Sequence, residues 1–164
     1  MGRSRWCLGL AMLSLAACGY RVVHPAGALT ERRGAVCAPM LENLTSEPAA
    51  EAVFTEALRG HLLRTGALSR GRCQVELTGQ VRSIGTSVGV LDQRGGVTSY
   101  RISASIRLAW SEEGRELRAL VLSDSEDALP GISLLETEVG REAAIRRLAE
   151  RLTGDALERL ALSE

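Results

Sequence analysis

Residues 73–81 read CQVELTGQV, and every second position from Cys73 to Val81 is apolar or small. Residues 100–110 repeat the pattern, with Tyr100 and every second residue up to Trp110 apolar or small. Alternation with a period of two is typical of strands that bury one face and leave the other in water. Both segments therefore predict strands of a half-buried sheet. Its polar face comprises Gln74, Glu76, Thr78, Gln80, Arg101, Ser103, Ser105 and Arg107.

The segments on either side of these strands have the period of a helix. Residues 45–48, TSEP, combine a cap residue, an early acid and an early proline, and thus predict the start of a helix. Gly66 is expected to end this helix. A second helix is expected after Pro130-Gly131, where Ser133 and Glu136 have capping-box spacing. The apolar stripes are Ala50, Val53, Phe54, Ala57, Leu58 and Leu62 in the first helix, and Ile145, Leu148, Ala149, Leu152, Ala156 and Leu160 in the second.

Two further strands complete the expected fold. One is short, at residues 35–39, and the other follows a tight turn and covers residues 116–123. The connection from Gly85 to Val97 is rich in glycine and predicts a long loop. The order strand, helix, three strands, helix predicts an α+β fold, a two-layer α/β sandwich with two helices on one face of a four-stranded mixed sheet. The first crossover is expected to be right-handed, which makes the strands it joins parallel.

The amino terminus has the features of a bacterial lipoprotein signal peptide. Arg3 and Arg5 precede a short apolar run, and Leu15-Ala16-Ala17-Cys18 places small residues before a cysteine. We therefore expect a signal peptide at residues 1–17, an acylated Cys18 opening a tether at residues 18–33, and a single domain at residues 34–164. Two or three acyl chains anchor a protein almost permanently, at about 0.8 kcal/mol per buried CH₂. Gly19 in place of aspartate favours sorting to the outer membrane.

The charge balance excludes several function classes. The chain has 20 basic and 20 acidic residues, whereas nucleic-acid-binding domains are strongly basic. After removal of the signal peptide, the four remaining aromatic residues are too few for a base-stacking surface. Neither a nucleic-acid partner nor a cofactor is expected.

Cys37 and Cys73 are the cysteines left once Cys7 is cleaved off and Cys18 is acylated. An exported, oxidising compartment permits a disulfide between them. The alternative is that both are small buried apolar residues, and the sequence favours neither interpretation. No spacing of cysteines and histidines predicts a metal site.

Residues 85–89, GTSVG, fit the spacing of the hydrolase nucleophile elbow. That motif needs a strand-to-helix turn and a histidine after the serine. Ser87 is followed by another expected strand, and both His24 and His61 precede it. Catalysis is therefore not expected, and His61, near the first apolar stripe, is interpreted as a structural histidine.

The polar sheet face has two interpretations. It is either the solvent side of the sheet or a surface facing a polar partner, such as the lumen of an outer-membrane barrel. Arginine binds phosphate through two parallel hydrogen bonds. Arg101 and Arg107 on this face, and Arg94 in the expected loop, are therefore candidate contacts for the phosphate groups of a lipid headgroup or for a partner.

The order of these features resembles the lipopolysaccharide-assembly lipoprotein family, LptE. The resembling segments are residues 18–21 (CGYR), 42–48 (ENLTSEP), 77–81 (LTGQV), the strand from Tyr100 to Leu108 and an arginine- and alanine-rich last helix. The resemblance implies a non-enzymatic, periplasm-facing lipoprotein of the outer membrane that plugs a large β-barrel, LptD, assists its assembly and supports lipopolysaccharide transport to the outer leaflet. The alternative is an auxiliary lipoprotein of another lipid transporter with a similar sandwich fold.

Overall fold

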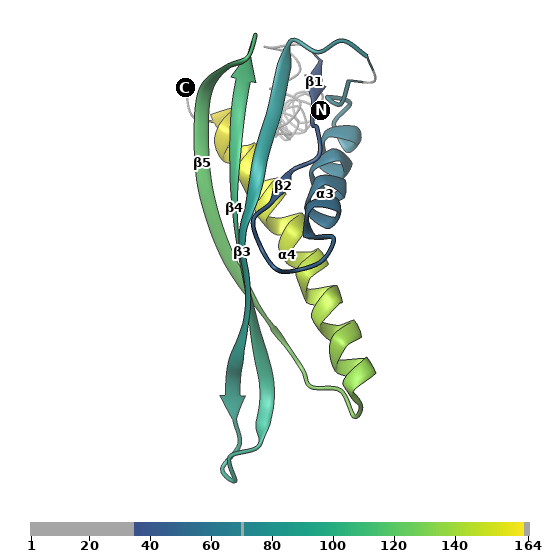
Figure 1. Cartoon of the computed structure of the whole chain (residues 1–164), viewed down its shortest axis with the longest axis vertical. Helices are drawn as coiled ribbons and strands as arrows, with labels where there is room; N and C mark the ends of the chain where they lie inside the picture. Colours follow the sequence, from purple (N-terminus) through teal and green to yellow (C-terminus); the bar gives the residue numbers. More distant parts are fainter. Residues whose placement is uncertain (1–34, 70, 163–164) are drawn as a thin grey trace, which may run out of the picture.

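The computed structural model describes residues 35–69 and 71–162. Its elements are β1 (Val36–Cys37), β2 (Glu42–Asn43), α3 (Ala50–Arg64), β3 (Val75–Leu91), β4 (Val97–Glu112), β5 (Arg115–Ala128) and α4 (Leu134–Leu162) (Figure 1). The strands form one mixed sheet in the order β1-β3-β4-β5, and β2 also pairs with β3. The predicted α+β class is confirmed, but the sheet has five strands where four were expected.

The strand that the sequence did not reveal is β2. It pairs in parallel with β3, with Glu42 opposite Gln80, and the Leu44 N–H donates to the Val81 carbonyl at 2.9 Å. Two residues are too short for any periodic signal. The parallel pairing expected for the first crossover is confirmed, since Val36 of β1 lies opposite Val75 of β3.

Both helices and one face of the sheet share a single core. The stripe of α3 and the stripe of α4 bury their apolar residues against the inward positions of β3 and β4. Burial of each large side chain contributes about 1.5–3 kcal/mol before entropy is subtracted. The largest fully buried side chains are Phe54, Leu58, Leu62, Leu77, Ile102, Ile106, Leu108, Leu148 and Leu152.

The prediction of a long loop from Gly85 to Val97 is wrong. β3 continues to Leu91, which pairs with Val97, so that β3 and β4 form a hairpin longer than the helices beside it (Figure 1). The glycines serve close strand contact rather than a loop, because a Cβ at Gly89 would lie 2.5 Å from the Ser99 Oγ. The real turn is residues 92–96, where Gly95 has a φ of 81°.

Two predicted boundaries also differ from the structure. α3 begins at Ala50, because Thr45 accepts a hydrogen bond from the Glu47 N–H in a separate turn and does not cap the helix. β5 extends beyond residue 123 to Ala128. Its second half carries the acids Asp124 and Glu126, and arginines of α4 compensate their charges.

Candidate functional site

The outer face of the sheet carries short polar side chains across three strands. Ser83, Ser105 and Ser123 lie opposite one another in one row, and Gly85, Ser103 and Ser125 form the next row. The predicted polar face is thus present as one surface. Long side chains flank these rows on both sides, and they include two of the three candidate arginines.

Arg101 and Arg107 each already have a carboxylate partner on this face. The Arg101 Nε and Nη2 donate to the two Asp127 oxygens at 2.9 and 3.1 Å. The Arg107 Nη2 donates to both Glu116 oxygens at 2.7 and 2.8 Å. The hydrogen bond from Arg101 lowers the pKa of Asp127 below its ordinary value. The charge of each guanidinium is therefore already compensated by a carboxylate, and that carboxylate repels an anionic ligand.

Arg94 lies apart from both, in the turn of the β3–β4 hairpin. The Asp92 Oδ1 accepts the backbone N–H of Arg94 at 2.8 Å and that of Gly96 at 2.7 Å, which fixes the turn. Within the described part of the chain, the Arg94 guanidinium has no ion-pair partner. The structure therefore does not bring the three candidate arginines together, and Arg94 is the one whose charge is uncompensated.

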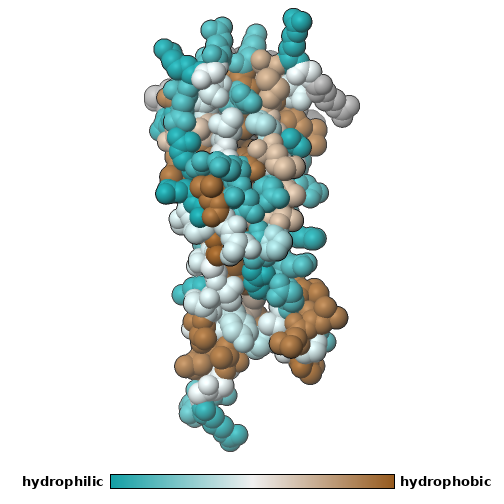
Figure 2. Space-filling view, in the orientation of Figure 1, coloured by the Kyte–Doolittle hydropathy of each residue, from teal (hydrophilic) through white to brown (hydrophobic). Residues whose placement is uncertain are grey.

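Large apolar side chains gather near the turn of the β3–β4 hairpin, and we call this end of the molecule the apolar pole. Figure 2 shows two apolar clusters at the lower end, where Figure 1 places the hairpin and the start of α4. Ile132 and Leu134 are 101% and 91% exposed. Exposed clusters of this kind mark interaction sites. The apolar pole comprises Val88, Val90, Leu91, Leu129, Ile132, Leu134, Leu135 and Val139.

A small cavity lies between the sheet and α4 beside the apolar pole. Its volume is about 80 Å³, and Tyr100, Ile102 and Leu129 supply most of its apolar lining. Arg141 also lines it, and this guanidinium is bonded to Glu47 and to Glu138. The cavity therefore offers an apolar environment without an uncompensated charge.

The described chain begins at the opposite end of the molecule. Val36 pairs with Val75 at the first residue of β3, whereas the hairpin turn follows the last residue, Leu91. At about 3.3 Å per residue, the two ends of β3 lie roughly 50 Å apart. A tether preceding residue 35 would thus join the domain far from the apolar pole.

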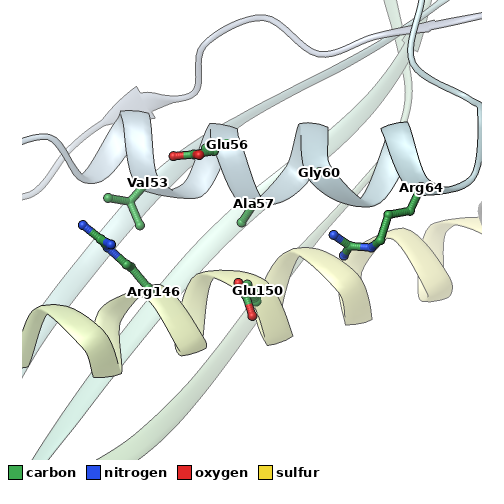
Figure 3. A pocket seen from close by; sticks show the side chains of 7 residues that line it. All are labelled: Val53, Glu56, Ala57, Gly60, Arg64, Arg146 and Glu150. Carbon is green, nitrogen blue, oxygen red and sulfur yellow. The ribbon is translucent and has the colours of Figure 1, made fainter. Parts of the chain in front are cut away.

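A groove of about 410 Å³ separates α3 and α4 on the side away from the sheet (Figure 3). Val53, Ala57 and Gly60 form its small-residue wall, while Arg146 and Glu150 line it from α4. His61 links the two helices nearby, with its Nε2 2.9 Å from the Glu150 carbonyl and its Nδ1 2.8 Å from the Arg64 Nη2. The contact with Glu150 joins α3 to α4, the contact with Arg64 lies within α3, and together they assign His61 a structural role.

Arginines of α4 compensate the acids in the second half of β5. Arg151 donates to Asp124 at 2.9 Å, and both Arg151 and Arg147 are bonded to Glu126. Burial raises the pKa of Glu126, but the hydrogen bonds from these arginines outweigh it, so the pKa lies below its ordinary value. The network therefore fastens α4 to β5 most firmly when the acids are ionised.

Ser87 does not lie in the setting of a nucleophile elbow. It lies within β3, not on a strand-to-helix turn, and its Oγ donates to the Arg101 carbonyl at 3.5 Å. In the described residues, no group of three histidines, cysteines or acids could hold a metal ion. Cys37 and Cys73 are joined by a disulfide, with Cα atoms 5.5 Å apart.

The family model described as "LptE: Lipopolysaccharide-assembly" matches residues 35–160. The chain belongs to the LptE family. The match runs from β1 to α4 and so includes both helices, the hairpin and the apolar pole. No curated protein matches the sequence.

Solved structures share the fold of this LptE-family chain. The rare lipoprotein B from Shewanella oneidensis is 17% identical, with a TM-score of 0.56 over 75% of this chain and 94% of that one. A putative lipoprotein from Caulobacter crescentus CB15 is 12% identical, with a TM-score of 0.58 over 85% of this chain and 93% of that one. At such identities these likenesses establish the fold alone.

Two findings concern the membrane association of this LptE-family protein. The predicted signal peptide, Cys18 and the tether lie outside the described residues. Between residues 35 and 162, no described helix is long and apolar enough to cross a bilayer.

The apolar pole was not predicted from the sequence, although the apolar residues around Pro130-Gly131 at the start of α4 were a visible signal.

Proposed function

We propose that this LptE-family protein is a lipoprotein anchored in the outer membrane by acyl groups on Cys18 and facing the periplasm. We propose further that it occupies the lumen of a large β-barrel of the LptD kind, assists the assembly of that barrel and supports delivery of lipopolysaccharide to the outer leaflet. The observation that carries the proposal is the family match over residues 35–160. The protein acts as a scaffold and not as an enzyme.

The outer sheet face supports a position inside a barrel. The interior of a large outer-membrane barrel is polar and hydrated. The rows of serines across β3, β4 and β5 are polar, and the charges of Arg101 and Arg107 are compensated by Asp127 and Glu116. Such a face therefore loses little hydration free energy when it approaches the hydrated inner wall of a barrel.

The apolar pole and Arg94 support a contact with lipopolysaccharide. An anionic amphiphile offers phosphate to a guanidinium and hydrocarbon to an apolar surface. Arg94 lies three residues beyond Leu91 in the hairpin, so both features are adjacent. Arg101 and Arg107 contribute less, because Asp127 and Glu116 already compensate their charges.

Purification of the full-length acylated protein in mild detergent tests the barrel partnership. We expect a large β-barrel protein to co-purify in a fixed ratio, and in its absence we expect the barrel to be poorly assembled. Recovery of an inner-membrane transporter in place of a barrel would contradict the proposal and favour the auxiliary-transporter alternative. A Cys18→Ser protein exported behind a signal peptide whose cleavage does not require acylation serves as the control for contacts that depend on membrane proximity.

Binding of purified lipopolysaccharide tests the residue assignment. Loss of a bidentate guanidinium–phosphate contact should weaken binding about tenfold in Arg94→Ala. Arg107→Ala is the matched control, because it removes an arginine already paired with Glu116. If Arg94→Ala combined with Arg101→Ala binds as tightly as the native protein, these contacts are discarded.

A further inference from the structure

The small cavity beside the apolar pole is suited to hydrocarbon and not to water. Almost all of the surface that lines it is apolar. Its threonines are bonded elsewhere, since Thr86 accepts from the Arg141 Nε at 3.4 Å and the Thr137 Oγ1 donates to the Ser133 carbonyl at 3.0 Å. A buried water needs two to four polar partners, and apart from Tyr100 this lining offers no polar side chain that is not already bonded.

The walls of the cavity continue outward as apolar surface. Val88 follows Thr86 by two residues on β3 and pairs with Tyr100, so it lies on the same face of the sheet as both. Leu134 precedes Thr137 by three residues on α4 and therefore lies on the same side of that helix. Val88 is 52% exposed and Leu134 is 91% exposed. The cavity is thus the inner end of an apolar path that leads to the apolar pole (Figure 2).

The volume of the cavity matches the end of a chain and not a whole ligand. An apolar cavity of about 150 Å³ holds a benzene molecule, so the volume of about 80 Å³ holds roughly half as many carbons, about three. An unbranched acyl chain can place its last carbons there while the rest of the chain lies along Val88 and Leu134.

Arg94 lies about one acyl chain length from the cavity. It follows Val88 by six residues, and six residues span at most about 20 Å. The hydrocarbon core of a bilayer is about 30 Å thick and holds two layers of chains, so one acyl chain spans about 15 Å. A phosphate at the Arg94 guanidinium and a chain end in the cavity therefore fit one anionic amphiphile. An apolar side chain of a partner protein could fill the cavity but would leave this cation unused.

We propose that the cavity receives the last carbons of one acyl chain of lipopolysaccharide, while Arg94 binds a phosphate of the same molecule. This assignment rests on the proposed contact with lipopolysaccharide. It adds the place where the hydrocarbon is bound and the length that the chain needs.

A series of alkyl phosphates with increasing chain length tests the path. The probes are titrated, below their micelle-forming concentrations, into the full mature chain carrying Cys18→Ser and exported behind a signal peptide whose cleavage does not require acylation. This protein needs no detergent, which would compete for the cavity. Each buried methylene should strengthen binding about fourfold, and the gain should stop once the chain is about 15 Å long. An affinity that does not depend on chain length would overturn the proposal.

Filling the cavity tests its role directly. Ala128 lines it, and Ala128→Leu adds about as many carbons as the cavity holds, so dodecyl phosphate should bind more than tenfold more weakly. Ala119→Leu is the matched control, because it adds the same atoms at an exposed position of the same strand. Equal affinities of the two variants would overturn the proposal.

A spin label gives a second measure that does not depend on the folding of Ala128→Leu. A nitroxide on the last carbon of the alkyl phosphate should broaden the methyl resonances of Ala128 and Ile102 in the protein without cavity substitutions. Unchanged resonances at saturating probe would place the chain end elsewhere and overturn the proposal.

Competition identifies the source of the acyl chain. Purified lipopolysaccharide should displace dodecyl phosphate, whereas lipopolysaccharide stripped of its acyl chains should not. Stronger displacement by phosphatidylglycerol vesicles would assign the cavity to a phospholipid and overturn the proposal. Equal binding of lipopolysaccharide by Ala128→Leu and Ala119→Leu would remove the cavity from the site and leave the proposed function intact. A missing barrel in the pull-down would contradict the proposed function without changing these affinities.

Discussion

Gly79 lies in the segment 77–81 that carries the family resemblance, and its replacement by alanine tests whether the fold depends on it. Gly79 is paired with Leu108 on β4. A Cβ there would lie 2.3 Å from the Arg107 carbonyl oxygen and 2.7 Å from the Leu108 Cδ2. A carbon–oxygen contact normally measures about 3.3–3.6 Å. The strands would have to separate by about 1 Å, because the blocking oxygen belongs to the backbone ladder.

The expected magnitude follows from two opposing effects. Overpacking a core usually costs about 1–3 kcal/mol, with the upper end expected where backbone must move. Replacing a glycine by alanine in a strand interior raises the free energy of unfolding by about 0.5–1 kcal/mol. Gly79→Ala should therefore lower the free energy of unfolding by about 2 kcal/mol. With a urea dependence of about 2 kcal/mol per molar, the unfolding midpoint should fall by about 1 M.

Gly85→Ala is the matched control on the same strand. Gly85 lies on the outer face, and a Cβ there would lie 3.4 Å from the Ser103 Oγ, a hydroxyl that can rotate. This variant should keep or raise the midpoint, by about 0.3–0.5 M. The assay is urea unfolding of the unlipidated chain with its disulfide formed. Equal midpoints for the native protein and Gly79→Ala, or an equal loss in Gly85→Ala, would refute the packing argument.

Three further outcomes are expected. Replacing Cys37 and Cys73 together by serine should lower the free energy of unfolding by about 3–4 kcal/mol, because the bridge closes a 36-residue loop; a gel-mobility shift on reduction checks the bond, and two free thiols in oxidised periplasmic material would contradict it. The pKa of Glu126 lies below the ordinary 4.5, so its stabilising contribution is complete above pH 4.5 and is lost as the pH falls through the lowered pKa; urea unfolding between pH 7 and pH 3 should show this loss, and Glu126→Gln should reduce the slope. Cys18→Ser should leave an unprocessed precursor without fatty-acid label, and normal labelling would rule out the anchor.

Much of the fold could be predicted because its strongest signals are periodic. The alternation from Cys73 to Val81 and from Tyr100 to Trp110 identified the central strands, and the apolar stripes identified both helices. Prediction failed where tertiary contacts replace periodicity. Gly89 indicated a loop, but its missing side chain allows Ser99 to approach across the hairpin. No local pattern reveals that contact before the strand register is known.

The candidate site was harder to predict for the same reason. The sequence shows twenty basic and twenty acidic residues but not their partners. Pairing of Arg101 with Asp127 depends on the β4–β5 register, and exposure of Ile132 depends on the path of the connection from β5 to α4, which runs to one side of the hairpin (Figure 1). Residue type therefore identified groups able to bind phosphate, and only the register distinguished paired from unpaired ones.

The distribution of these pairs decides which arginine can meet an anionic ligand. A ligand phosphate at Arg101 would compete with Asp127, whose ionised form the ion pair itself favours, so that charge repulsion accompanies every approach. In the turn that holds Arg94, the acid Asp92 already accepts two backbone N–H groups. Hydrogen bonds to backbone donors satisfy that carboxylate without consuming the guanidinium. If the protein binds lipopolysaccharide as proposed, selectivity for an amphiphile arises at the hairpin, where the Arg94 cation and the apolar pole adjoin. A variant that lengthens the hairpin by two residues between Leu91 and Val97 should then separate phosphate binding from hydrocarbon binding.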